Sequence, residues 1–281
     1  MRARLVVLAL VSALLAGCGG SGSSTPTIAP ARTYSLTHFE PAGVAKPNTP
    51  TTVSFTIRSP DGSPLTAFKR GPGPHTGVHL ILVRDDLAYI VHRHPPISPD
   101  GTISDKITFP APGTYRTVID VYPRYGDQPN FQLFRTVRVA GTYKRKPLPR
   151  PARSVTVDGY TFTLDQVPRL HAIQAAFLKL RVTGPDGKPA HFMPWYGALA
   201  HAIFFRKGSL DYFHTHICAP NAPNCGTLPG VASSRISGTS SAPGKLTIGV
   251  LLPEPGTWRL FLQMKLAGRI VTAPFTLQVA S

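Results

Sequence analysis

Glutamate is scarce in this chain of 281 residues and occurs only at Glu40 and Glu254. Asp and Glu together number 13, against 30 Lys and Arg, so the formal net charge is +17. The sequence therefore lacks repeated pairs of carboxylates for acid–base catalysis. It also contains no Gly-x-Ser-x-Gly elbow and no phosphate-cradling glycine loop. A metal-dependent hydrolase would have no evident general base. We therefore expect a protein that is not an enzyme.

Long apolar runs are missing as well. The longest, Leu5 to Leu15, has 11 residues, whereas a transmembrane helix needs about 20. With Arg2 and Arg4 before it, the run has the size of a signal-peptide core. We expect a signal peptide over residues 1–17.

The run ends in Leu15-Ala16-Gly17-Cys18, which resembles the bacterial lipobox. In that motif the thiol at the position of Cys18 receives a diacylglycerol and becomes the first residue of the mature protein. The alternative is ordinary signal cleavage nearby, with Cys18 incidental. The resemblance implies a protein of the cell envelope, outside the cytoplasm, that is attached to the membrane through an N-terminal lipid.

The segment that follows, residues 18–31, consists mainly of Gly, Ser, Thr and Pro and predicts a flexible tether. Without residues 1–17 the chain keeps 28 basic and 13 acidic residues, a charge of about +15. Such a charge attracts anionic lipid headgroups or envelope polymers. Nucleic acid is not an expected partner of an exported protein. The alternative is a basic surface that is simply solvated.

Cysteine is rare, with three residues in the chain. If Cys18 carries the lipid, Cys218 and Cys225 remain as a pair in one loop, and outside the cytoplasm a disulfide between them is expected. A thiolate ligand or nucleophile at Cys218 is the alternative.

Proline and glycine, by contrast, are abundant: 30 and 25 residues, spread over the whole chain. They interrupt it too often for long helices. Short runs rich in Val, Thr, Phe and Tyr lie between them, for example Val53–Ile57 and Phe275–Val279. This pattern predicts an all-β protein built from sandwiches with short strands.

The chain also repeats itself. Both halves contain the same blocks in the same order, and the spacing of 13 residues from His79 to His92 recurs from His201 to His214. The blocks of the first half are Val53–Arg58, Pro60–Gly62, Val78–Leu80, Leu87–Tyr89, His92–His94 and Phe109–Arg116, and those of the second are Leu178–Val182, Pro185–Gly187, Ala200–Ala202, Leu210–Tyr212, His214–His216 and Leu252–Arg259. We interpret the halves as tandem copies of one domain.

Alternating prolines and basic residues mark the boundary between the copies. We expect one β-sandwich domain over residues 32–140, a stiff cationic linker over 141–154 and a second β-sandwich domain over 155–281. Each is the size of an immunoglobulin-like sandwich. In each domain the Pro-Gly-Thr-aromatic segment predicts a sandwich corner, with Tyr115 and Trp258 as core anchors.

The histidines of each copy are expected to converge. A β-hairpin with a two-residue turn at Asp85 and Asp86 places His79 directly opposite His92, with Cβ atoms about 5 Å apart. His94 lies two residues further on and projects from the same face. In the second copy, His201, His214 and His216 are predicted to do the same, although the turn there shifts by one residue and needs a bulge to keep the pairing.

Two such triads favour metal binding. Three neutral imidazoles suit Zn(II) or Cu(II), with a fourth position open to water, a ligand or another metal-handling protein. His75 is a further candidate ligand in the first copy, and His191 or Cys218 in the second. The alternative is that the histidines are core residues, because Ile81 and Val83 lie on the same face as His79.

The His92–Pro96 segment and the Pro-Gly-Thr-aromatic-Arg segments at 112–116 and 255–259 resemble a family. The chain is similar to secreted bacterial lipoproteins with tandem immunoglobulin-like domains and a His…His-x-His-Pro signature. The resemblance covers most of residues 32–281 and implies heavy-metal handling without enzymatic activity. The chain departs from the signature at Val78 and Ala200, which replace glycine, and at Ile217, which replaces proline.

Overall fold

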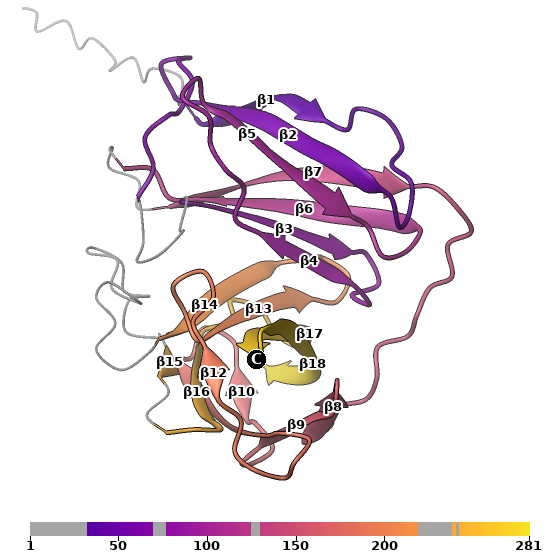
Figure 1. Ribbon diagram of the computed structural model, residues 1–281, viewed down its shortest axis with the longest axis vertical. Coiled ribbons are helices and arrows are strands. Elements are labelled where there is room, and N and C mark those ends of the chain that lie inside the picture. Colours follow the sequence, from indigo (N-terminus) through magenta and orange to yellow (C-terminus); the bar gives the residue numbers. More distant parts are fainter. Residues whose placement is uncertain (1–32, 70–76, 125–129, 219–237, 240–241) are drawn as a thin grey trace, which may run out of the picture. The chain divides into compact units, whose positions relative to one another are not determined.

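The structure is a computed structural model that describes residues 33–69, 77–124, 130–218, 238–239 and 242–281 (Figure 1). Every regular element in these residues is a β-strand, which confirms the all-β class. Residues 34–281 form one compact unit. Across the described ranges we find no helix that is long and apolar enough to cross a membrane. The predicted signal peptide and tether, including Cys18, lie outside the described residues.

The first repeat is a sandwich of two antiparallel sheets (Figure 1). One has the order β1-β2-β5 and the other β4-β3-β6-β7. The strands are β1 (Ser35–Glu40), β2 (Pro50–Arg58), β3 (Val78–Arg84), β4 (Ile90–Arg93), β5 (Thr102–Thr108), β6 (Gly113–Val121) and β7 (Phe131–Val139). Alternate side chains of each strand, such as Phe55 and Leu80, fill the core between the sheets.

The second repeat has the same two layers, but its strands are hydrogen-bonded into one continuous sheet. The strand order is β10-β18-β17-β13-β14-β15-β16-β11-β9-β8. Its layers are joined through β15, which pairs with both β14 and β16. The strands are β8 (Ser154–Val157), β9 (Tyr160–Leu164), β10 (Leu170–His171), β11 (Ala176–Thr183), β12 (Phe192–Met193), β13 (Ala200–Arg206), β14 (Tyr212–Cys218), β15 (Gly238–Thr239), β16 (Lys245–Val250), β17 (Gly256–Leu266) and β18 (Arg269–Ala280).

The strand orders match between the repeats. In the first repeat β4-β3-β6-β7 corresponds to β14-β13-β17-β18 in the second, and β1-β2-β5 corresponds to β9-β11-β16. The described residues therefore contain two tandem immunoglobulin-like sandwiches, as the internal repeat predicts. Between them, residues 140–153 contain no strand, and the backbone N–H of Lys146 donates to the carboxylate of Asp86.

The two predicted corners are confirmed. Tyr115 is fully buried, and its hydroxyl donates to the backbone oxygen of Ala111 at 2.9 Å. Trp258 is equally buried, and its indole N–H donates to the oxygen of Glu254, also at 2.9 Å. Both bonds span four residues and tie the start of a core strand to the turn before it, as the tyrosine corner of immunoglobulin-like domains does.

The predicted register of the first hairpin is wrong by two residues. His92 is paired with Ile81, not with His79. The turn takes four residues, since the N–H of Arg84 donates to the oxygen of Tyr89. Within this turn the carboxylate of Asp86 is buried against the Arg84 guanidinium. A shift of two keeps every side chain on its predicted face.

The second hairpin has the same register as the first. Arg206 N–H donates to the oxygen of Asp211, which again leaves a four-residue turn, and His201 is paired with His216. Continuing the first register by one pair places His79 opposite His94 in the same way. The shifted sequence spacing in the second turn therefore leaves the hairpin pairing unchanged.

Strands β3 and β13 are buried on both faces. One face of each strand fills the core of its own sandwich, and the other contributes to a third apolar cluster that contains residues of both repeats. This cluster consists of Ile81, Val83, Leu87 and Val118 from the first repeat and Ile203, Phe205 and Phe261 from the second. His79 and His201 lie on the same faces, next along their strands. The packing of this face brings the histidines of both repeats together.

Candidate metal centre

The six histidines of the two predicted triads form one cluster. Three groups of three have ligand atoms within 4.8 Å of one another: His79, His92 and His94; His79, His214 and His216; and His92, His201 and His214. The first predicted triad is thus among them. The second triad is not, because its members group with histidines of the first repeat. The expectation of two separate sites is replaced by a single cluster that both repeats build.

The three groups overlap. Any two of them share one histidine, namely His79, His92 or His214. Two ions, each with three imidazoles of its own, therefore cannot occupy two of these groups at once. The arrangement suits one ion.

A buried carboxylate lies beside the cluster. Asp120, on β6, faces Nδ1 of His79 at 3.6 Å and Nδ1 of His214 at 3.9 Å through its Oδ2 atom. The hydroxyls of Tyr122 and Tyr212 donate to the same oxygen at 3.0 and 3.3 Å. Burial alone raises the pKa of Asp120, but its contacts with His214 and His79 hold that pKa below the usual range. Asp120 is therefore a buried anion.

None of the described contacts of Asp120 is with a Lys or Arg side chain. Burial and the Asp120 charge raise the pKa of both Tyr122 and Tyr212 well above the usual range, so these side chains stay neutral donors. Burial lowers the pKa of His214 to about 4. A buried charge is costly unless it is compensated, and a cation held by the histidines would compensate it.

In the group of His92, His201 and His214, one ring nitrogen of His92 and one of His201 forms a hydrogen bond outside the cluster, and one of His214 faces a carboxylate. His92 donates its Nδ1–H to the side-chain oxygen of Gln263 at 3.1 Å, and His201 donates its Nε2–H to the backbone oxygen of Trp195 at 3.0 Å. The Nδ1 atom of His214 faces Asp120, and a proton is favoured there because a lone pair would face the carboxylate. Outer contacts of this kind orient metal-ligating histidines in proteins.

These contacts direct the lone pairs of His92, His201 and His214 inward. Nδ1 of His201 and Nε2 of His214 lie 3.4 Å apart, and with the protons on the opposite ring nitrogens both atoms would offer lone pairs to a metal ion. Two ligand atoms of a tetrahedral zinc site are separated by about 3.3 Å, given zinc–nitrogen bonds of about 2.0 Å. In the group of His92, His201 and His214, one pair of nitrogens therefore has the spacing of a tetrahedral zinc site, and all three ligand atoms lie within 4.8 Å of one another.

A tight turn of the second repeat covers the cluster. Trp195 and Ala198 exchange two backbone hydrogen bonds, while Tyr196 and Gly197 between them have positive φ angles, as in a type I′ turn. The Tyr196 ring stacks on His94 of the first repeat with centroids 3.8 Å apart. The turn thus places the Trp195 carbonyl on one histidine and an aromatic ring on another.

One family model matches the chain over residues 33–144 and 155–281, which correspond to the two repeats. Its description is a domain of unknown function, DUF8832. The chain belongs to the DUF8832 family. Among curated proteins, none matches this chain in sequence.

Solved structures resemble this DUF8832 chain only distantly. Salmonella alpha-2-macroglobulin is 12% identical, with a TM-score of 0.26 and coverage of 88% of this chain and 14% of that one. Domains 4 and 5 of the S-layer protein SbsC are 13% identical, with a TM-score of 0.21 and coverage of 89% and 98%. Invasin, a bacterial integrin-binding protein, is 13% identical, with a TM-score of 0.21 and coverage of 88% and 39%.

The other candidate ligands of the DUF8832 chain lie apart from the cluster or outside the described residues. His191 is exposed just before β12 and belongs to none of the three groups. His75 lies outside the described residues. Cys218 ends β14, is disulfide-bonded and is therefore not a thiolate ligand. Its predicted partner Cys225 also lies outside the described residues, so that pairing stays a prediction.

Sequence reasoning notes Asp120 and Gln263 at corresponding places of the two copies, but it assigns none of the residues around the histidines to the site. Asp120 stands in the otherwise apolar run Val118–Val121, and a carboxylate at a buried strand position was the signal that could have identified it. Gln263 stands at the corresponding place in β17. No pattern in the sequence pointed to Trp195 or Tyr196, because their contacts are made in a turn and with the other repeat.

Proposed function

We propose that this chain binds a single Zn(II) or Cu(II) ion in the six-histidine cluster and acts as a metal-binding protein of the cell envelope. The observation that carries the proposal is the meeting of six imidazoles beside Asp120, a buried anion without a Lys or Arg partner among the described contacts. His92, His201 and His214 are the proposed principal ligands, because each has an outer contact that leaves a lone pair directed inward.

The donor chemistry supports a borderline metal ion. Neutral imidazole suits Zn(II) and Cu(II), whereas Mg(II) and Ca(II) prefer oxygen ligands. The three groups contain no thiolate or thioether, which disfavours Cu(I). A bound ion would contribute Lewis acidity, but we propose sequestration or transfer, since the described surroundings provide no evident general base other than the engaged Asp120.

Export and lipid attachment are part of the proposal and rest on the sequence alone. The signal-peptide pattern over residues 1–17 and the lipobox-like Leu15–Cys18 segment support them. Anchored by Cys18 and the Gly/Ser-rich tether, the two repeats would hold the metal outside the cytoplasm. Mass spectrometry of the N-terminal peptide from the native membrane tests this directly: a diacylglyceryl cysteine is expected, and an unmodified Cys18 would contradict it.

Isothermal titration with Zn(II) and Cu(II) tests metal binding, after treatment with a chelator. The wild-type chain should bind one ion, and the triple variant His92→Ala, His201→Ala, His214→Ala should bind none. The matched control changes three other histidines, His38, His171 and His191, to alanine. Equal affinity in wild type and the cluster variant, with both folded by circular dichroism, would refute the proposal. Loss of binding in both triple variants would also count against this site.

A further inference from the structure

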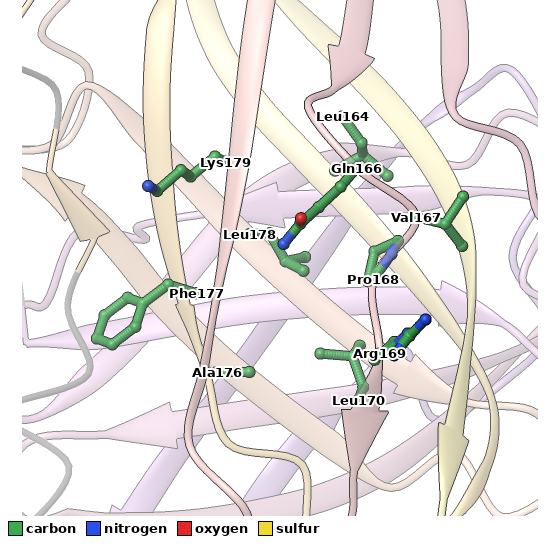
Figure 2. Close-up of a pocket in the computed structure, with 10 residues that line it drawn as sticks. All are labelled: Leu164, Gln166, Val167, Pro168, Arg169, Leu170, Ala176, Phe177, Leu178 and Lys179. Atoms are coloured by element: carbon green, nitrogen blue, oxygen red, sulfur yellow. The ribbon is translucent and has the colours of Figure 1, made fainter.

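A groove lies on the second repeat between the loop of residues 165–169 and strand β11 (Figure 2). The buried side chains of Leu164, Leu170 and Leu178 lie along its floor. β11 belongs to the layer with β9 and β16, whereas the histidines of this repeat are on β13 and β14 in the other layer. The groove is therefore separate from the metal centre.

Large apolar side chains are exposed around this groove. Val167 on the loop is 73% exposed, and Phe177 on β11 is 52% exposed. Ile173, in the turn between β10 and β11, is 80% exposed. Single exposed apolar residues are ordinary on protein surfaces. Here, three of the most exposed large apolar side chains lie within residues 167–177. Two of them, Val167 and Phe177, line the same groove.

Basic side chains accompany the apolar ones on both walls. Figure 2 shows Arg169 next to Val167 on the loop side, and Lys179 next to Phe177 on β11. On the outer face of β11, Arg181 follows Lys179 and is directly paired with Lys245 of β16. Like charges in directly opposite strand positions are destabilising.

One carboxylate faces these cations. Asp165 forms an ion pair with Arg181 at 2.9 Å. Among the ion pairs of the described residues, only this one involves Arg169, Lys179 or Arg181, so the charges of Arg169 and Lys179 keep the surface positive. Its cations thus exceed what the local ion pairing needs, and they surround exposed apolar groups.

We propose that this surface, made of Val167, Arg169, Ile173, Phe177, Lys179 and Arg181 and here named the β11 face, docks onto an anionic lipid bilayer. Apolar side chains that enter the boundary between headgroups and acyl chains, flanked by cations that pair with anionic headgroups, are the features of a protein that lies on a membrane. A polyanionic polymer would need the cations but would leave Val167, Ile173 and Phe177 in water.

The inference depends neither on metal binding nor on a lipid at Cys18. The strands of β13 and β14 lie in the layer opposite the β11 face, so docking would leave the histidine layer of this repeat turned away from the bilayer.

Co-sedimentation with vesicles tests the proposal. The protein is residues 34–281, the compact unit that contains all described strands, used after its cooperative unfolding has been verified. This form carries no lipid or signal segment that could bind by itself. The vesicles are phosphatidylcholine with or without phosphatidylglycerol. Binding is expected only with phosphatidylglycerol and should weaken with added salt.

Two variants separate the apolar and the ionic contributions. Arg169→Gln with Lys179→Gln should weaken binding on the order of 30-fold, and Val167→Ser with Phe177→Ser should weaken it as well. The matched controls are Lys144→Gln with Arg145→Gln in the exposed linker, and Val44→Ser, which changes another exposed valine. Both controls should bind like the wild type.

Three outcomes would overturn the inference. One is an equal loss in the linker control, which would mean that total charge alone drives binding. Another is unchanged binding after Val167→Ser and Phe177→Ser, which would favour a soluble polyanion. The third is the absence of binding to phosphatidylglycerol vesicles. None of these outcomes would bear on the metal titration, so the two proposals can fail separately.

Discussion

His92 of the first repeat donates its Nδ1–H to the side-chain oxygen of Gln263 in the second repeat, across 3.1 Å. Gln263 occupies in β17 the position that Asp120 occupies in β6, since each is paired with the first histidine of its own hairpin. Asp120 faces His214 of the second repeat in turn. Equivalent contacts therefore run both ways between the repeats: a histidine of each repeat faces the β6 or β17 side chain of the other. The halves of a symmetric dimer contact each other in this way. The two contacts differ in charge, because Asp120 is a carboxylate and Gln263 is an amide.

We predict that Asp120→Asn lowers metal affinity about 10- to 100-fold, which is the usual cost of losing an outer contact of a ligand. The metal-free chain should not be strongly destabilised, because asparagine keeps an acceptor for the Tyr122 and Tyr212 hydroxyls and removes a buried charge. Calorimetric titration and thermal unfolding measure the two effects. Asp105→Asn, at a half-buried ion pair with Arg93, is the control and should bind metal normally. Unchanged affinity in Asp120→Asn would contradict the role of the buried anion.

Single substitutions should rank the six histidines. Changing His92, His201 or His214 to alanine should lower affinity by more than about 100-fold, beyond the cost of losing an outer contact. Changing His79, His94 or His216 should cost less, because the principal group stays complete. Elemental analysis should give one ion per chain, since the three groups overlap. Two tightly bound ions, or an equal effect of all six substitutions, would contradict this assignment.

Periodicity in the sequence predicted which face each histidine occupies but not its pairing partner. Side chains alternate along a strand, so His92 and His94 share a face for any register that shifts by two. The turn length decides the register, and the four-residue turns closed by Arg84–Tyr89 and Arg206–Asp211 backbone hydrogen bonds are not revealed by the spacing of the histidines. The face was therefore predicted correctly, and the partner of His92 was not.

The joining of the two triads was not predictable from either repeat alone. Each repeat supplies an apolar stripe beside its histidines, Ile81 and Val83 in the first and Ile203 and Phe205 in the second. A stripe of this kind indicates that the face is buried but not what buries it. The interpretation of Ile81 and Val83 as core positions was correct for this reason. The core they join belongs to both repeats.

We expect the metal-free chain to lose stability as the pH falls from about 6.5 to about 4. Burial lowers the pKa of His92 well below its usual range, as do the neighbouring His201, His214 and His79, and burial lowers that of His214 to about 4. In this interval the unfolded chain takes up protons that the folded chain does not, so stability decreases with acid. For His214 alone the loss is about 3 kcal/mol.

Urea unfolding at several pH values checks this dependence. The variant His92→Gln with His214→Gln should show a shallower decrease between pH 6.5 and 4, because two groups with lowered pKa values are gone. His171→Ala, at an exposed histidine, should decrease like the wild type. A double variant whose stability follows the wild-type curve would contradict the assignment of this pH dependence to the cluster.

Tyr115→Phe should separate the fold from the metal site. The substitution removes the hydroxyl that donates to Ala111 and leaves a buried oxygen without its donor, which costs about 1–2 kcal/mol of unfolding free energy. Metal affinity should stay unchanged, because Tyr115 packs in the core of the first sandwich and belongs to none of the three groups. Tyr34→Phe, at a tyrosine that stacks on Phe131, is the matched control and should cost less. Lower metal affinity of Tyr115→Phe in a chain that is still folded would contradict this prediction. Tyr115 would then help to hold the histidine cluster in place and would not be a core anchor alone.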